Sequence, residues 1–152
     1  DPVVKDNQLY AVSYQGQIAA MEIETGSTIW ERALSSYSGL AVSNNAVFVA
    51  DPSGVVWALS RKTGDVLWKK TDLMGRQLSA PAVIDGLTVL GDNDGYLHWM
   101  SQNDGTFIGQ NLVDSKGIKA TPIIKDNLVY VLGQSGKVAA LTPENKVVSR
   151  GN

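Results

Sequence analysis

A catalytic triad or a histidine-based metal site would have to rest on one residue of this chain. Its 152 residues include a single histidine, His98, and no cysteine. The missing thiols exclude disulfides, thiolate zinc sites and a cysteine nucleophile within the sequence. A histidine without a second histidine or a cysteine makes a poor zinc ligand set. We therefore expect His98 to serve packing or a channel-facing polar contact rather than catalysis.

A short acidic run, Asp92-Asn93-Asp94-Gly95, is a second candidate for chemistry, because carboxylate and amide oxygens bind calcium. An EF-hand loop needs another oxygen ligand before its glycine and a glutamate at the twelfth position, where this chain has Asn103. The run also resembles an ordinary hairpin turn, and we interpret it so. We expect no metal and no cofactor.

Composition narrows the function further. A net charge of -2, from 13 basic and 15 acidic residues, provides no general positive field for nucleic acid or an anionic membrane. No apolar run reaches the roughly 18 residues of a membrane-spanning helix. These properties favour a binding or scaffolding protein over an enzyme, with no nucleic acid among its partners.

A repeat of about 40 residues organises the chain and must position any functional side chain. Four glycines that each follow a polar residue lie 38, 41 and 41 residues apart: Gly16, Gly54, Gly95 and Gly136. A second glycine stands ten residues after the first three anchors, and a lysine stands there in the fourth repeat: Gly26, Gly64, Gly105 and Lys146. Such regular spacing indicates one structural unit used four times.

Each unit consists of short runs rich in Val, Ile and Tyr, separated by turn pairs such as Asp-Asn and Ser-Gly. This pattern predicts four short antiparallel strands per unit, and no segment keeps a helical period over ten residues. A four-stranded unit of this length is typical of a β-propeller blade. We predict an all-β chain with blades at about 1–36, 37–74, 75–114 and 115–152 and no second domain.

The residues after the third strand resemble the blade motif of the PQQ-like propellers, a four-stranded blade of the WD40 type. The segments Ala20–Trp30 and Ala58–Trp68 follow the pattern Ala-x-Asp-x-x-Thr-Gly-x-x-x-Trp, with Glu22 and Ser60 in place of the aspartate. The resemblance implies that each tryptophan docks on a neighbouring blade beside a Thr-Gly turn, whose glycine allows close approach. The alternative is a stacking platform for a sugar or a quinone. The residues assigned to docking are Trp30, Trp68, Gly26, Gly64 and Gly105.

Within these propellers, two longer blocks and the opening Asp1-Pro2-Val-Val resemble the BamB family, lipoproteins of the bacterial outer-membrane β-barrel assembly machinery. The blocks are 71–81 and 91–100, the second containing Gly-Tyr-Leu-His-Trp. The resemblance implies an eight-bladed ring of which this chain is the C-terminal half. It also implies a lipid anchor outside the chain and a place on the periplasmic face of the outer membrane. The expected function is a non-enzymatic scaffold that binds the BamA periplasmic domains, other assembly subunits and, as a second class of partner, unfolded outer-membrane proteins.

The loops between blades are the candidate binding segments, because rigid sheets commonly present function on their connections. Leu73, Met74 and Arg76 form an apolar cluster with an arginine, a composition suited to an interface. The alternative for Leu73 is a satellite core under its loop. The resemblance places the family's BamA-binding loops on earlier blades, so Asp1 is the remaining candidate at the edge of such a loop.

An uneven charge distribution is the other partner signal. Five cations and two acids lie between Arg61 and Arg76, whereas Asp85 to Asp114 contains five acids and no Lys or Arg. This change of sign either steers a partner or reflects solvated turns.

Two functions from different classes remain open. The first is the assembly scaffold, and the second is a fragment of a quinoprotein dehydrogenase, since PQQ-like blades also build those enzymes. The enzyme family's vicinal cysteine pair is absent, which favours the scaffold. Four blades would also leave two blade faces uncovered, so we expect either self-association of two copies or a larger parent ring.

Overall fold

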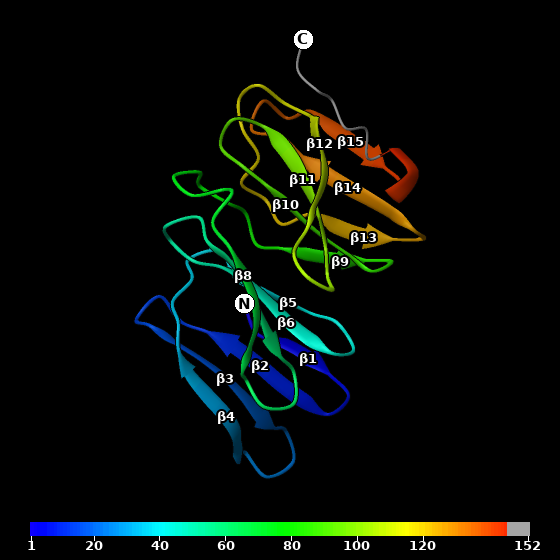
Figure 1. The fold of residues 1–152 in the computed structure, drawn as a ribbon. Coiled ribbons are helices and arrows are strands. Elements are labelled where there is room, and N and C mark those ends of the chain that lie inside the picture. The colour runs from blue at the N-terminus through cyan, green and yellow to red at the C-terminus, as the bar shows by residue number, and fades with distance from the viewer. Residues whose placement is uncertain (146–152) are drawn as a thin grey trace.

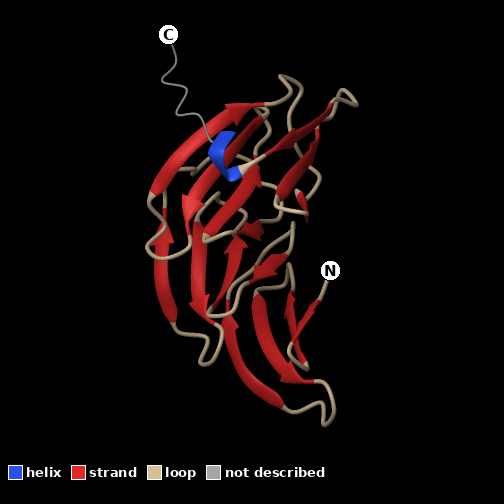
Figure 2. Ribbon diagram, turned by 90° about the vertical axis from the view of Figure 1, so that its right-hand side faces the viewer, coloured by secondary structure: helices blue, strands red, loops and turns tan. Residues whose placement is uncertain are grey.

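The computed structural model describes residues 1–145 and consists of four antiparallel sheets that follow one another along a curved row (Figures 1 and 2). Each sheet is a meander in which consecutive strands pair. Blade 1 contains β1 (Val3–Lys5), β2 (Gln8–Val12), β3 (Gln17–Glu22) and β4 (Thr28–Ala33). Blade 2 contains β5 (Leu40–Val42), β6 (Ala46–Ala50), β7 (Val56–Ser60) and β8 (Val66–Lys70). Blade 3 contains β9 (Ala82–Ile84), β10 (Leu87–Gly91), β11 (Tyr96–Ser101) and β12 (Phe107–Leu112). Blade 4 contains β13 (Ile123–Lys125), β14 (Leu128–Leu132) and β15 (Val138–Leu141), followed by the short 3-10 helix η1 (Pro143–Asn145).

Tight turns with two consecutive positive φ values form the first hairpins of blades 1, 3 and 4. Asp6 and Asn7 both have positive φ, at 49° and 64°, and Asp126 and Asn127 repeat the geometry at 50° and 60°. Two consecutive positive φ values match the right-handed twist of the flanking strands. Asparagine, aspartate and glycine tolerate this conformation best, which explains the turn pairs seen in the sequence.

The hydrophobic core lies between blades rather than within one. One cluster joins blades 1 and 2, a second joins blades 2 and 3, and a third joins blades 3 and 4. The innermost strands β1, β5, β9 and β13 contact one another in sequence along the row. Alternation of side chains along each strand gives a blade two faces, so every inner blade contributes to two cores.

The meander gives the row of blades two distinct sides. Because neighbouring strands run antiparallel, the second hairpin turn of each blade emerges on the same side as the connections between blades. These connections are 34–39, 71–81 and 113–122, and the turns are 13–16, 51–55, 92–95 and 133–137. We call this side the loop face. The first and third hairpin turns lie on the opposite side, which we call the turn face.

The predicted all-β propeller fold is confirmed. The blade boundaries stay an interpretation, and the fourth predicted blade and its Lys146 extend beyond the described residues. In residues 1–145 no helix is long and apolar enough to span a membrane.

Candidate partner-binding face

The connections of the loop face are held against the hairpin turns beneath them. Gly54, at φ +87°, has no room for a side chain, because a methyl group there would overlap the Leu73 carbonyl. The Gly75 amide donates a hydrogen bond to the Ser53 carbonyl at 2.9 Å. In blade 3, Gly95 comes equally close to the Asp114 carbonyl of connection 113–122. Connections 71–81 and 113–122 therefore pack closely on the hairpin turns instead of extending freely into solvent.

Within connection 71–81, the three predicted interface residues have different environments. Leu73 is 5% exposed and belongs to the core between blades 2 and 3. Met74 is 57% exposed beside it. The Arg76 side chain is about one-third exposed and points to blade 3, where it pairs with two aspartates. Leu73 thus anchors the connection, which leaves Met74 and the outer part of Arg76 accessible to a partner.

Asp92, in the second hairpin turn of blade 3, is fully buried and satisfied on both oxygens. Its Oδ1 accepts the amides of Asp94 and Tyr96, both at 3.0 Å. Its Oδ2 accepts Arg76 at 2.6 Å and lies 2.7 Å from His98 Nε2. Arg76 also reaches Asp94 at 3.2 Å. The acidic run is consequently a turn closed by an arginine from the preceding connection.

The electrostatics of this cluster follow from its hydrogen bonds. Burial alone would raise the pKa of Asp92, but hydrogen bonds from His98, the Tyr96 amide and Arg76 outweigh it and lower that pKa from 3.8 to about 2. A carboxylate cannot donate, so His98 Nε2 carries the hydrogen. His98 Nδ1 has no hydrogen-bond partner within residues 1–145. His98 is buried in blade 3 with Asp92 as its polar partner, and in the same residues no cluster of three His, Asp or Glu side chains suits a metal ion.

Blade 2 contains the equivalent pair at Asp51 and Trp57, one repeat of 41 residues earlier. Asp51 Oδ1 accepts the amides of Ser53 and Val55 at 2.9 and 3.1 Å, and Oδ2 accepts Trp57 Nε1 at 3.0 Å. All three donors are neutral. Unlike Asp92, Asp51 remains partly exposed.

Blade 4 has Gly133 in this column, and a carboxylate from the preceding connection replaces the missing side chain. Asp114 packs directly on Gly133, where a methyl group would overlap it. Its Oδ2 accepts the Ser135 amide at 2.8 Å and the Ser135 hydroxyl at 2.7 Å. These bonds, with one from the Lys116 amide, lower the pKa of Asp114. Three successive turns are thus each closed by a carboxylate.

A hollow of about 300 Å³ opens on the loop face between connections 34–39 and 71–81. Its wall residues come from both connections and from the second hairpin turn of blade 2: Tyr37, Ser38, Ala50, Asp51, Pro52, Gln77 and Leu78. Tyr37 is 76% exposed and stacks on Tyr14, with ring centroids 6.4 Å apart and planes 18° apart. An exposed aromatic pair beside a hollow is a typical feature of an interaction surface.

The predicted docking residues lie between consecutive blades. The Trp30 indole covers Gly64, with no space for a Cβ, and donates to the Arg61 carbonyl at 2.9 Å. Trp68 repeats this arrangement on Gly105 and donates to the Gln102 carbonyl at 2.9 Å. Gly26 belongs to the first blade and has open space above it. The two tryptophans are mostly buried in these contacts, which leaves no free stacking platform at either position.

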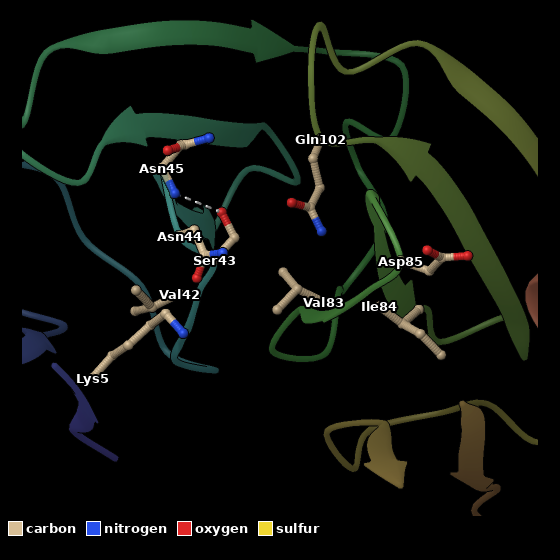
Figure 3. A pocket seen from close by; sticks show the side chains of 9 residues that line it. All are labelled: Lys5, Val42, Ser43, Asn44, Asn45, Val83, Ile84, Asp85 and Gln102. Carbon is tan, nitrogen blue, oxygen red and sulfur yellow. Dashed lines mark hydrogen bonds between the residues drawn. The ribbon is translucent and has the colours of Figure 1, made fainter. Parts of the chain in front are cut away.

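Asp1 is exposed at the loop-face end of β1, in blade 1. One of the hollows of the turn face, of about 340 Å³, has walls from blades 1, 2 and 3 (Figure 3). Its polar groups come from Lys5, Ser43, Asn44, Asn45, Asp85 and Gln102. These groups are spread over three blades, and the backbone amide of Asn45 donates a hydrogen bond to the Ser43 hydroxyl at 3.4 Å.

From the sequence we interpret Asp92 as part of a hairpin turn, but Asp51 and the pairing of both aspartates with a ring nitrogen were missed. Asp51 and Asp92 stand three residues before an anchor glycine, and Trp57 and His98 stand three residues after it. A ring nitrogen opposite a carboxylate at constant spacing was the available signal.

Comparison with known proteins gives one consistent family. Residues 1–70 match the family described as outer membrane protein assembly factor BamB. The curated BamB of Pseudomonas aeruginosa is 41% identical over 140 residues, which cover 92% of this chain and 37% of that protein. The crystal structure of BamB from Moraxella catarrhalis superposes with a TM-score of 0.85 at 32% identity, covering 91% of this chain and 41% of that chain. The resemblance inferred from the two sequence blocks is confirmed.

A more distant likeness concerns the blade architecture alone. A quinohemoprotein alcohol dehydrogenase from Comamonas testosteroni superposes with a TM-score of 0.76 at 18% identity, covering 95% of this chain and 33% of that chain. Identity this low shows a shared fold. The present chain spans less than half the length of both the Moraxella BamB and this dehydrogenase.

Proposed function

Because the chain belongs to the BamB family of outer membrane protein assembly factors, we propose that it is part of a non-enzymatic scaffold for outer-membrane protein assembly. The supporting observation is that sequence and fold both match BamB proteins along nearly the whole chain. The relatives are named as assembly factors rather than as enzymes. The scaffold function is to hold polypeptide partners on a rigid propeller.

The loop face is the part of this chain best suited to that task. Its connections are tied to the hairpin turns by backbone hydrogen bonds or close glycine contacts, and it presents Met74, Tyr14 and Tyr37 to solvent. Exposed methionine and tyrosine on a rigid support are favourable interface residues, because little conformational entropy is lost on binding. The proposed partners are the periplasmic domains of BamA and, second, unfolded outer-membrane proteins. The proposed site of action is the periplasmic face of the outer membrane.

Binding to immobilised periplasmic domains of BamA tests this proposal. We expect the chain to be retained at low salt and Met74→Ser to weaken retention about tenfold, a typical effect for an interface anchor. Leu67→Ser is the matched control, since Leu67 is 53% exposed on β8 and lines a hollow of the turn face. A folded chain that is not retained at low salt would contradict the proposal, and so would equal losses from both variants.

The dehydrogenase alternative rests only on the shared blade fold. Titration with calcium and pyrroloquinoline quinone separates the two functions directly. Micromolar binding of both by this chain would overturn the scaffold assignment.

A further inference from the structure

The hollow beside Tyr37 contains a carboxylate with no cation on it. Asp51 lines the wall and is partly exposed. Its hydrogen-bond donors are two backbone amides and the Trp57 indole, all neutral. No ion pair within residues 1–145 includes Asp51, and Lys69 lies over the ring of Trp57 instead, 5.2 Å from its centroid. The hollow therefore carries a negative charge available to an incoming cation.

The next blade shows what fits at such a carboxylate. Asp92 occupies the same repeat position as Asp51, and there the guanidinium of Arg76 closes the site at 2.6 Å. Arg76 comes from connection 71–81, which spans eleven residues. The corresponding connection before blade 2, 34–39, has six residues and contains no arginine or lysine. Blade 2 thus has the carboxylate of this arrangement without the arginine.

From this internal comparison we propose that the hollow beside Tyr37 binds an arginine side chain supplied by a partner polypeptide. The guanidinium would pair with Asp51 as Arg76 pairs with Asp92. The exposed ring of Tyr37 would stack on its face, and Pro52 and Leu78 would contact its carbon stem. This inference rests on the proposed function, because it names the chemistry by which the loop face recognises a polypeptide.

Arginine fits this hollow better than lysine. A planar guanidinium stacks on an aromatic ring and donates to a carboxylate at the same time, whereas an ammonium is a compact point charge. Arginine is also less strongly hydrated, so its burial between Tyr37 and Leu78 costs less. The hollow should consequently prefer arginine over lysine and reject neutral citrulline, which has nearly the same shape.

Nuclear magnetic resonance of the four tryptophan indoles provides a specific readout. Trp57 Nε1 donates to Asp51, so a cation at that carboxylate must shift the Trp57 signal. Trp30 and Trp68 donate to backbone carbonyls of the turn face and act as internal controls. We expect a short blocked peptide with one central arginine to shift Trp57 in a saturable manner, the lysine peptide to bind several-fold more weakly, and the citrulline peptide to have no effect.

Three variants locate the site. Asp51→Asn removes the charge and is expected to weaken arginine-peptide binding about tenfold, the usual effect of losing a charged hydrogen bond. Tyr37→Ala should weaken it several-fold through loss of the stacking wall. Asp72→Asn is the control, because Asp72 is exposed on the same face outside the hollow. Unchanged Trp30 and Trp68 signals verify that each variant is folded.

The outcomes are separable from those of the proposed function. No Trp57 shift with the arginine peptide, equal shifts with citrulline, or equal losses from Asp51→Asn and Asp72→Asn would overturn the arginine site. If BamA domains still retain the chain in that case, only this inference fails. If the peptide binds as expected but BamA domains do not retain the chain, the proposed function fails and the arginine site stands.

Discussion

The second hairpin turns of blades 2 and 3 are both held by an aspartate, but only the aspartate of blade 3 is paired with a cation. Each turn is closed by an aspartate that accepts two backbone amides and one ring nitrogen. In blade 3 the carboxylate also pairs with Arg76 and is fully buried. In blade 2 it has no cation and stays partly exposed. The comparison separates what closing the turn requires from what a cation adds.

The largest expected difference follows from deleting each carboxylate. Asp92→Ala would leave His98 and Arg76 without their shared acceptor and two amides unpaired, and should lower the unfolding free energy by about 3–5 kcal/mol. Asp51→Ala removes hydrogen bonds from neutral donors only, at a partly exposed site, and should cost about 1–2 kcal/mol. Urea unfolding followed by tryptophan fluorescence measures both. Equal losses would mean that the cation contributes nothing to blade 3.

Removing the arginine should make blade 3 resemble blade 2. Arg76→Ala is expected to cost about 2 kcal/mol, less than loss of the buried aspartate, because Arg76 is partly exposed and His98 still pairs with Asp92. It should also free Asp92 to accept the arginine peptide, which would then shift the ring signals of His98. Arg76→Lys, which keeps the charge, is the matched control. A variant with unchanged stability and no new peptide response would contradict the assigned role of Arg76.

The pH dependence of blade 3 tests the same ion pair. The folded pKa of Asp92 is about 2, below its ordinary value of 3.8. A carboxyl group with a lowered folded pKa contributes stability above its unfolded pKa and loses it as the pH falls through the folded one. This contribution, about 2 kcal/mol, should therefore disappear between pH 4 and pH 2.

The variant Asp92→Asn isolates that contribution from other acids, such as Asp114, whose pKa is also lowered. The difference in unfolding free energy between the unmodified chain and Asp92→Asn should shrink across this window. A constant difference would show that Asp92 does not carry the expected charge effect.

The repeat explains why much of the fold could be predicted from the sequence. Anchor glycines, turn pairs and Trp30 or Trp68 recur at fixed spacing because strands, turns and blade contacts recur in space. The connections have no such constraint: 34–39 and 71–81 differ in length, so no column aligns their residues. The repeat spacing therefore does not predict the contact of Arg76 with Asp92. It also does not decide whether an apolar loop residue such as Leu73 faces the core or the solvent. The hollow beside Tyr37 depends on both connections and emerges only from their packing.

The smallest expected effect comes from replacing the side chain whose ring nitrogen donates to the aspartate. Trp57→His gives blade 2 the ring of blade 3 and should cost about 1 kcal/mol at pH 8, since Trp57 is only partly buried against the core between blades 1 and 2. Asp51 would raise the folded pKa of the introduced imidazole, and a raised pKa contributes stability below the unfolded value that is lost as the pH rises. The deficit relative to the unmodified chain should thus narrow at pH 5. Urea unfolding at both pH values provides the measurement, and an equal deficit at pH 5 and pH 8 would show that the Asp51 carboxylate does not act on a neighbouring cation.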